Sequence, residues 1–228
     1  MAIAYITDDA YANGNPVSLA MPAGVVQGNL MIAFVAVQDD NGLSSVNTLA
    51  GWNFIGKVSS SAGSYVNLSA FWRIAGSGEA GPYSWTATAG SGSNIGGLDG
   101  MIWAFSGTAQ TAPINNFAIK VGPNTSTTII IPALTETFQS GEWYIACVCD
   151  SNNTSYTSTT PTCTYYDATG GFWESFNIGA YAPVSSAAAM TWTTTGTWSS
   201  AAVGIAVSIL PPGTGASVIP PSTQIIFM

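Results

Sequence analysis

Apolar side chains recur along this chain in short runs that turn-forming residues separate. Within residues 66–74, every second residue from Val66 onward is apolar, whereas the positions between them include Asn67, Ser69 and Arg73. This alternation is typical of a β-strand that buries one face. No helical period is sustained over three turns. The pattern predicts an all-β protein, an antiparallel β-sandwich with a jelly-roll-like arrangement of strands.

Thirteen apolar runs are expected to form strands, seven in the first half of the chain and six in the second. They cover residues 3–6, 17–21, 30–37, 52–58, 66–74, 83–88, 101–105, 117–121, 127–131, 143–149, 176–181, 190–195 and 203–210. Clusters of Gly, Ser, Asn and Pro lie between them and predict turns.

Two of these runs are apolar on both faces. The first lies in residues 28–38, GNLMIAFVAVQ, and the second in residues 141–149, GEWYIACVC. Each begins with a glycine that is typical of a turn and then stays apolar for seven or more positions. A strand with two apolar faces is expected between two layers. We call these segments the first spine and the second spine, and predict that each is a central strand.

The two spines belong to a longer internal similarity. At an offset of 113 positions, Gly28, Ile32, Ala33 and Val35 have identical counterparts in the second spine. A Pro-Ala pair precedes each spine, at positions 22 and 132, and SWTAT at 84–88 is echoed by TWTTT at 191–195. The sequence therefore predicts an internal duplication, with two similar halves at approximately residues 1–107 and 114–211.

The duplication allows one composite sandwich over residues 1–211 or two small sandwiches in tandem. We favour the composite body, because the connector at 107–113 is short and contains no charged or proline-rich linker. Residues 212–228 differ in character and are expected to form an extended C-terminal arm. Diproline pairs at 211–212 and 220–221 prevent the arm from joining a central sheet. Its apolar end, IIFM, needs a surface to cover, preferably on a neighbouring molecule, where it could add a strand to an open edge.

Charge and composition restrict the classes of function. Charged residues make up 6% of the chain, against about 25% in typical soluble domains. Lys57, Arg73 and Lys120 are the basic residues against eleven acidic ones, so the net charge of -8 opposes nucleic-acid binding. The sequence has no histidine, which removes imidazole-based catalysis and the commonest metal ligand. We expect no enzymatic activity and assign no catalytic, cofactor-binding or metal-binding residue.

The cellular context follows from the N-terminus and the cysteines. No basic residue precedes the short apolar run at the N-terminus, and no run reaches the length of a membrane span, so we expect neither a secretory signal nor membrane insertion. Cys147 and Cys149 point to the same face of one strand and cannot easily bond each other. A Cys149–Cys163 disulfide is left open, although buried thiols are favoured.

Acidic and amide side chains follow both spines. Asp39, Asp40 and Asn41 come after the first, whereas Asp150, Ser151, Asn152 and Asn153 come after the second. Such oxygens suit calcium, but Asp and Asn also form turns by bonding their own backbone, and we favour turns. Asp8 and Asp9 are interpreted as a solvated strand end, because the sequence places no second carboxylate opposite them. The glycine-rich residues 90–97 are expected to form a mobile hairpin loop.

Eight tryptophans raise the question of sugar binding, because aromatic rings stack on sugars. Five of them lie inside strand-like runs and are expected in the core: Trp72, Trp85, Trp103, Trp143 and Trp192. The other three lie beside Gly or Ser at the edges of runs and are the candidates for an exposed glycan site: Trp52, Trp173 and Trp198.

Several short motifs resemble a known group of proteins. They are PAG at 22–24, GNL at 28–30, GW at 51–52, FWRIA at 71–75, YSW at 83–85, AFSG at 104–107, WSSAAV at 198–203 and LP at 210–211. This succession, over roughly residues 15–211, is similar to β-sandwich modules of bacteriophage structural and tail-associated proteins and of some bacterial surface proteins. The resemblance implies a fold and an assembly role but carries no catalytic residues.

The resemblance implies a virion protein, most plainly a capsid decoration or other accessory structural protein. Its partners would be the major capsid or tail proteins and further copies of itself, with neither nucleic acid nor membrane. It would be assembled in the host cytoplasm and released with the particle at lysis. The alternative is a carbohydrate-binding or adhesion module of a tail tip or cell surface. A glycosidase or depolymerase that uses two carboxylates is the third reading.

Overall fold

Every strand pairing in this computed structural model is antiparallel. The structure describes residues 2–8, 12–60, 65–122, 127–134, 138–150, 156–160, 162–170, 175–181, 189–194 and 202–213. No helix occurs among these residues, so none of them lies in a helix that could cross a membrane. The predicted all-β antiparallel sandwich is confirmed, whereas its jelly-roll form stays a prediction.

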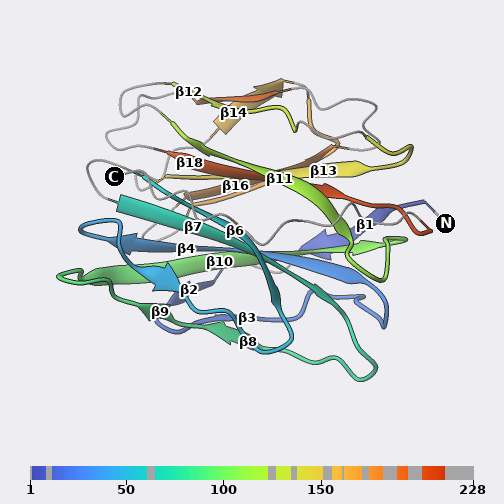
Figure 1. The fold of residues 1–228 in the computed structure, drawn as a ribbon, viewed down its shortest axis with the longest axis horizontal. Coiled ribbons are helices and arrows are strands. Elements are labelled where there is room, and N and C mark those ends of the chain that lie inside the picture. Colours follow the sequence, from blue (N-terminus) through green and yellow to red (C-terminus); the bar gives the residue numbers. More distant parts are fainter. Residues whose placement is uncertain are drawn as a thin grey trace.

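Two large sheets lie at the centre of the molecule, and smaller sheets cover their outer faces (Figure 1). The first large sheet has the order β1-β10-β4-β7-β6, with β2 paired to β10. Its strands are β1 (Ala4–Asp8), β2 (Ala12–Gly14), β4 (Leu30–Asp39), β6 (Asn53–Ser59), β7 (Tyr65–Ile74) and β10 (Ile95–Ser106). The second large sheet has the order β11-β18-β13-β16-β15. Its strands are β11 (Ile114–Val121), β13 (Trp143–Asp150), β15 (Tyr165–Gly170), β16 (Ser175–Tyr181) and β18 (Val203–Ile209).

The smaller sheets form the two outer layers. In the first half, β3 (Val17–Leu19) pairs with β8 (Tyr83–Trp85), and β5 (Ser45–Val46) pairs with β9 (Ala87–Thr88). In the second half, β17 (Met190–Thr194) lies between β12 (Thr128–Ile131) and β14 (Tyr156–Thr160). One strand of the second half, β17, therefore takes the place of both β8 and β9.

The order of strands is the same in both halves. In each large sheet, the first strand of the half pairs with its last strand, which pairs with the spine strand, as β1-β10-β4 and β11-β18-β13. The other neighbour of the spine strand is β7 or β16, followed by β6 or β15 at the edge. This matching order is what an internal duplication requires, although the duplication itself stays a prediction.

One hydrophobic core, which we call the shared core, lies between the two large sheets. Its members are Ile3, Leu30, Ile32, Phe34, Ala36, Ile55, Val58, Val66, Leu68, Ala70, Met101, Trp103, Phe105, Ile114, Trp143, Ile145, Cys147, Cys149, Ile178, Ala180, Val203, Ile205, Val207 and Ile209. Both halves contribute to this list, so each half covers an apolar sheet face of the other. Burying such faces is the main stabilisation available to a chain with so few charges.

Both spines are buried on both faces, as the pattern predicts. Along β4, Ile32 and Phe34 face the shared core, whereas Ala33 and Val35 face the outer sheet. Along β13, alternate residues likewise face the shared core or the apolar cluster beneath the outer sheet of the second half. The glycine before each spine has a positive φ, 86° at Gly28 and 89° at Gly141. A side chain is disfavoured in that conformation, which explains why a glycine stands at both positions.

Four strands among the described residues lie where the apolar pattern predicts none: β2, β5, β14 and β15. They are short or rich in hydroxyl side chains, so they lack the apolar alternation that identifies a strand. Pairing with a neighbouring strand, rather than local sequence, makes them extended.

Candidate functional site

The acidic segment after the first spine forms a hydrogen-bonded turn. One carboxylate oxygen of Asp39 accepts the backbone N–H of Gly42 at 2.8 Å, and the other accepts that of Ser44 at 2.7 Å. Asp39 is itself buried. Its oxygens therefore replace backbone partners within the turn, which is the favoured reading of this segment.

The same turn is bonded to the glycine-rich loop between β9 and β10. Asp40 accepts the backbone N–H of Asn94 at 2.9 Å and the side-chain amide of Asn94 at 2.7 Å. These two bonds lower the pKa of Asp40. The side-chain amide of Asn41 donates to the carbonyl oxygen of Ser91 at 3.2 Å, and the Ser93 hydroxyl contacts the side-chain oxygen of Asn41. The loop predicted to be a mobile hairpin thus has at least four polar contacts with its neighbour.

Lys57 binds the other side of this turn. Its ammonium group donates to the carbonyl oxygen of Ser44 at 2.6 Å. Burial lowers the pKa of Lys57, and the carboxylate of Asp39 opposes that shift. One of the three basic residues is therefore engaged in holding a loop against the large sheet.

The remaining acidic candidates do not form a site among the described residues. Asp150 is buried at the end of β13, and residues 151–155, with Ser151, Asn152 and Asn153, lie outside the described part of the chain. Asp8 accepts the hydroxyl of Tyr5 at 2.8 Å, and Asp9 is also outside the described part. Within the described ranges, no three His, Cys, Asp or Glu side chains come close enough to hold a metal ion.

The expectation that Trp52 is exposed is wrong. Its exposed fraction is 5%, and its ring meets the rings of Tyr83 and Trp85 edge-on, with centroids 5.2 and 5.0 Å apart. Position next to a glycine at the edge of a run did not mean exposure, because the turn before β6 directs the ring under the outer sheet. Trp173 and Trp198 lie outside the described residues.

The tryptophans predicted to lie in the core are found there. Trp85, Trp103, Trp143 and Trp192 are buried, and Trp72 is partly buried against the shared core. Among the described residues, two other aromatic side chains are exposed, and periodicity did not identify them. Tyr165 is 39% exposed and Phe54 is 36% exposed.

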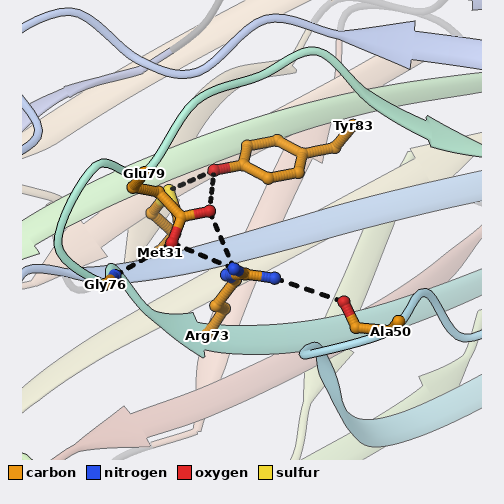
Figure 2. Close-up of polar contacts among 6 residues, drawn as sticks. All are labelled: Met31, Ala50, Arg73, Gly76, Glu79 and Tyr83. Atoms are coloured by element: carbon orange, nitrogen blue, oxygen red, sulfur yellow. Dashed lines mark hydrogen bonds and ion pairs between the residues drawn. The ribbon is translucent and has the colours of Figure 1, made fainter.

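An ion pair that the sequence analysis missed closes the connection between β7 and β8. Figure 2 shows the carboxylate of Glu79 between Arg73 and Tyr83. The guanidinium of Arg73 lies 2.9 and 3.0 Å from the two carboxylate oxygens. The second terminal nitrogen of Arg73 donates to the carbonyl oxygen of Ala50 at 3.2 Å. This bond joins the β7–β8 connection to the turn before β6. Gly51 in that turn has a φ of 78° and lies so close to Arg73 that a side chain there would collide with it.

Two further donors complete the environment of Glu79. The backbone N–H of Gly76 donates to one oxygen at 2.9 Å, and the hydroxyl of Tyr83 donates to the other at 2.8 Å. Burial raises the pKa of Glu79, but the surrounding donors outweigh it and hold the pKa below its ordinary value of 4.5. Burial and the neighbouring carboxylate raise the pKa of the Tyr83 hydroxyl.

The contacts of the Glu79 carboxylate suit a structural role better than a catalytic one. Both oxygens of Glu79 already accept two contacts each, and its side chain is 7% exposed. A general base needs an oxygen that can reach a substrate proton. Little in the sequence indicates this ion pair. Arg73 and Glu79 lie on either side of a glycine-containing turn, so strand periodicity does not place their side chains together.

The three cysteines are thiols. Cys147 and Cys149 belong to the shared core, whereas Cys163 packs against the cluster under the outer sheet of the second half. The second large sheet therefore separates Cys149 from Cys163, and the disulfide left open by the sequence is not formed. Cys163 is partly exposed, so the expectation of burial holds for two of the three. Burial raises the pKa of the Cys147 thiol well above its ordinary value.

Comparison with known proteins identifies no relative: no family model, no curated protein and no solved structure matches this chain.

Proposed function

We propose that this protein is a non-enzymatic structural component of a bacteriophage particle, a capsid decoration or other accessory protein. The observation that carries the proposal is the shared core, in which two large sheets bury each other. Such a body is rigid and presents loops and sheet edges as its contact surfaces. The resemblance of its turn and packing motifs to phage β-sandwich modules points the same way.

The charged groups of the body support a mechanical role. Lys57 and Arg73 are engaged in holding loops, and Asp39 and Glu79 accept bonds from the backbone of their own turns. The remaining surface is weakly charged, in keeping with 6% charged residues in the chain. We infer binding to the particle through backbone pairing at sheet edges and through the arm at 212–228. Residues 214–228 lie outside the described part of the chain.

The proposed partners are the major capsid or tail proteins and further copies of the same chain. Synthesis and assembly would take place in the host cytoplasm, with release in the particle at lysis. The net charge of -8 opposes contact with the packaged nucleic acid.

The test is the position and copy number of the protein in purified particles, measured by quantitative mass spectrometry and electron cryo-microscopy. We expect hundreds of copies on the capsid surface. A few copies at the tail tip would favour the alternative below, and absence from the particle would overturn the proposal. Loss of residues 212–228 should reduce incorporation, and unchanged incorporation would remove the arm from the mechanism.

A carbohydrate-binding or adhesion role is the second candidate, and one observation favours it. The exposed ring of Tyr165 lies where the two halves meet. Its centroid is 4.6 Å from that of the Tyr5 ring and 5.8 Å from that of the Trp143 ring, on which it stacks. Exposed aromatic rings are common in sugar sites. Binding on a glycan array that Tyr165→Ala abolishes would support this role. Trp173→Ala and Trp198→Ala test the candidates outside the described residues, whereas Trp52 is buried and no longer a candidate.

A further inference from the structure

β12 is an edge strand with an exposed apolar side chain. It pairs with β17 from Thr128↔Thr193 to Ile131↔Met190 and forms one side of the three-stranded sheet. Ile129 and Ile131 are buried beneath the sheet, whereas Ile130 is 50% exposed. An edge strand offers a row of backbone N–H and C=O groups to a further strand.

The matching strand of the first half has different chemistry at this place. β3 pairs with β8 as β12 pairs with β17, and its middle residue, Ser18, stands where β12 has Ile130. Ser18 is exposed, and its hydroxyl oxygen accepts a hydrogen bond from Ser84 at 3.2 Å. The first half therefore closes this position with a polar pair, whereas the second half presents an isoleucine.

The other longer edge strands carry features that discourage pairing. Bulges interrupt the register of β1, β6, β11 and β14. The sequence of β15 contains the charged residue Asp167. β12 contains no charged residue, and its pairing with β17 has no irregularity. Bulges and charges are the usual protection of sheet edges, and β12 is the edge strand of four or more residues, among those described, that has neither.

We propose that β12 receives a strand formed by the C-terminal segment IIFM, residues 225–228, of a second copy of this chain. The inference deepens the proposed assembly role and rests on it. Fifteen residues follow Gly213, the last described residue, and their final segment carries apolar side chains and no charged side chain. A strand without charged side chains matches an edge without charged side chains, because pairing buries Ile130 without desolvating a charged side chain.

The length of the arm allows it to reach β12 of its own copy as well, and the proposed assembly role is what selects a second copy. Ile131 lies beside Gly204 at the beginning of β18, where an added Cβ would be 2.9 Å from its Cδ1. The arm leaves after the opposite end of β18, a strand of seven residues that is about 23 Å long. The eleven residues 214–224 before IIFM extend about 39 Å at most, which also exceeds this length, so a wild type that stays monomeric would indicate that the arm pairs with its own body.

Such a contact is head-to-tail: each copy offers an arm to one neighbour and an edge to another. Contacts of this kind generate rings or open chains of subunits.

The test uses purified full-length protein, with molecular mass measured by sedimentation velocity over a range of concentrations. We expect the wild type to associate, and Ile130→Lys to weaken association at least about tenfold because it places a charge on the edge. Ser18→Lys is the matched control at the equivalent position of the first half and should associate like the wild type. Ile130→Ser, which adds no charge, should also weaken association, and circular dichroism verifies that each variant is folded.

A mixing experiment distinguishes the proposed contact from other modes of association. Ile130→Lys keeps the arm but lacks the edge, whereas a chain without residues 222–228 keeps the edge but lacks the arm. At concentrations just sufficient for the wild type to associate, each alone should be mainly monomeric, and their mixture should form a 1:1 dimer and nothing larger. A wild type that is monomeric at all concentrations would overturn the proposal. Association that survives loss of residues 222–228 would also overturn it, because β12 would then pair with something else.

These measurements need no particle. If the protein is absent from virions, the proposed function fails but the self-association result stands. If the protein is present in virions but does not self-associate through β12, only the role of β12 fails.

Discussion

The two halves of this molecule share an arrangement of strands but differ in how their outer layers are secured. In the first half, the ion pair of Arg73 with Glu79 closes one connection, and the turn at Asp39 is bonded to the loop at Asn94 by way of Asp40. In the second half, Cys163 packs against the cluster under the outer sheet, and the edge strand β12 carries no charged residue. The comparison teaches that apolar sheet faces determine the strand order that the two halves share, whereas the polar contacts differ between the halves.

The shared core is the feature that joins the halves, and its disruption should have the largest effect. Ile32 and Ile145 occupy equivalent places in the two spines, and both are fully buried in this core. We expect Ile32→Ala and Ile145→Ala each to lower the free energy of unfolding by about 3 kcal/mol, because each leaves a cavity. Urea denaturation followed by tryptophan fluorescence measures both.

The same experiment sharpens the comparison of the halves. If the shared core couples them, each variant shifts one common unfolding transition. Two separate transitions, of which each variant moves only one, would contradict that coupling. Val26→Ala is the control, since Val26 is 64% exposed and its truncation should change stability by less than about 0.5 kcal/mol.

The ion pair of the first half should have an intermediate effect. Glu79→Gln removes the carboxylate that four contacts surround, and leaves the Arg73 guanidinium without its counter-charge. Breaking a fully buried pair costs about 3–5 kcal/mol. The side chain of Arg73 is 26% exposed, so solvent screening reduces the expected loss to about 2 kcal/mol. Thermal or urea unfolding at neutral pH measures the change.

The effect of Glu79 should depend on pH with a definite sign. Its pKa is lower in the folded state than its ordinary value of 4.5. The stabilisation is therefore fully present above about pH 4.5 and lost as the pH falls through the lower folded-state pKa. Glu79→Gln should flatten the decline of stability below pH 4.5. Asp40→Asn is the comparison: hydrogen bonds also lower the pKa of Asp40, but Asp40 is exposed, so we expect a smaller flattening, and an equal one would contradict the assignment to Glu79.

The cysteines of the second half should show the smallest effect. We expect a thiol reagent to modify Cys163 first in the native protein, because Cys147 and Cys149 are fully buried and burial raises the pKa of Cys147. All three thiols should react in denaturant, and Cys163→Ser should remove the fast native phase. A single reactive thiol in denaturant would instead reveal a disulfide and contradict the separation of Cys149 from Cys163 by the sheet.

Local pattern predicted the strands whose burial follows from their own side chains. Both spines were identified because each is apolar on two faces, and the glycines before them have the positive φ that a turn requires. Strands β14 and β15 were not predicted, since hydroxyl-rich segments become strands only through a partner. Trp52 was misplaced for a related reason, because the direction of a side chain at the end of a run depends on which layer covers it.

By itself, the sequence determined the all-β class, the two buried spines and the turn at Asp39, since each follows from periodicity or from the bonding habits of short side chains. Tertiary structure decided which sheet faces meet in the shared core, why Glu79 lies against Arg73 and Tyr83, and that β12 lies at one side of its three-stranded sheet. These contacts join residues distant along the chain, and packing between layers brings them together. No local pattern contains that information.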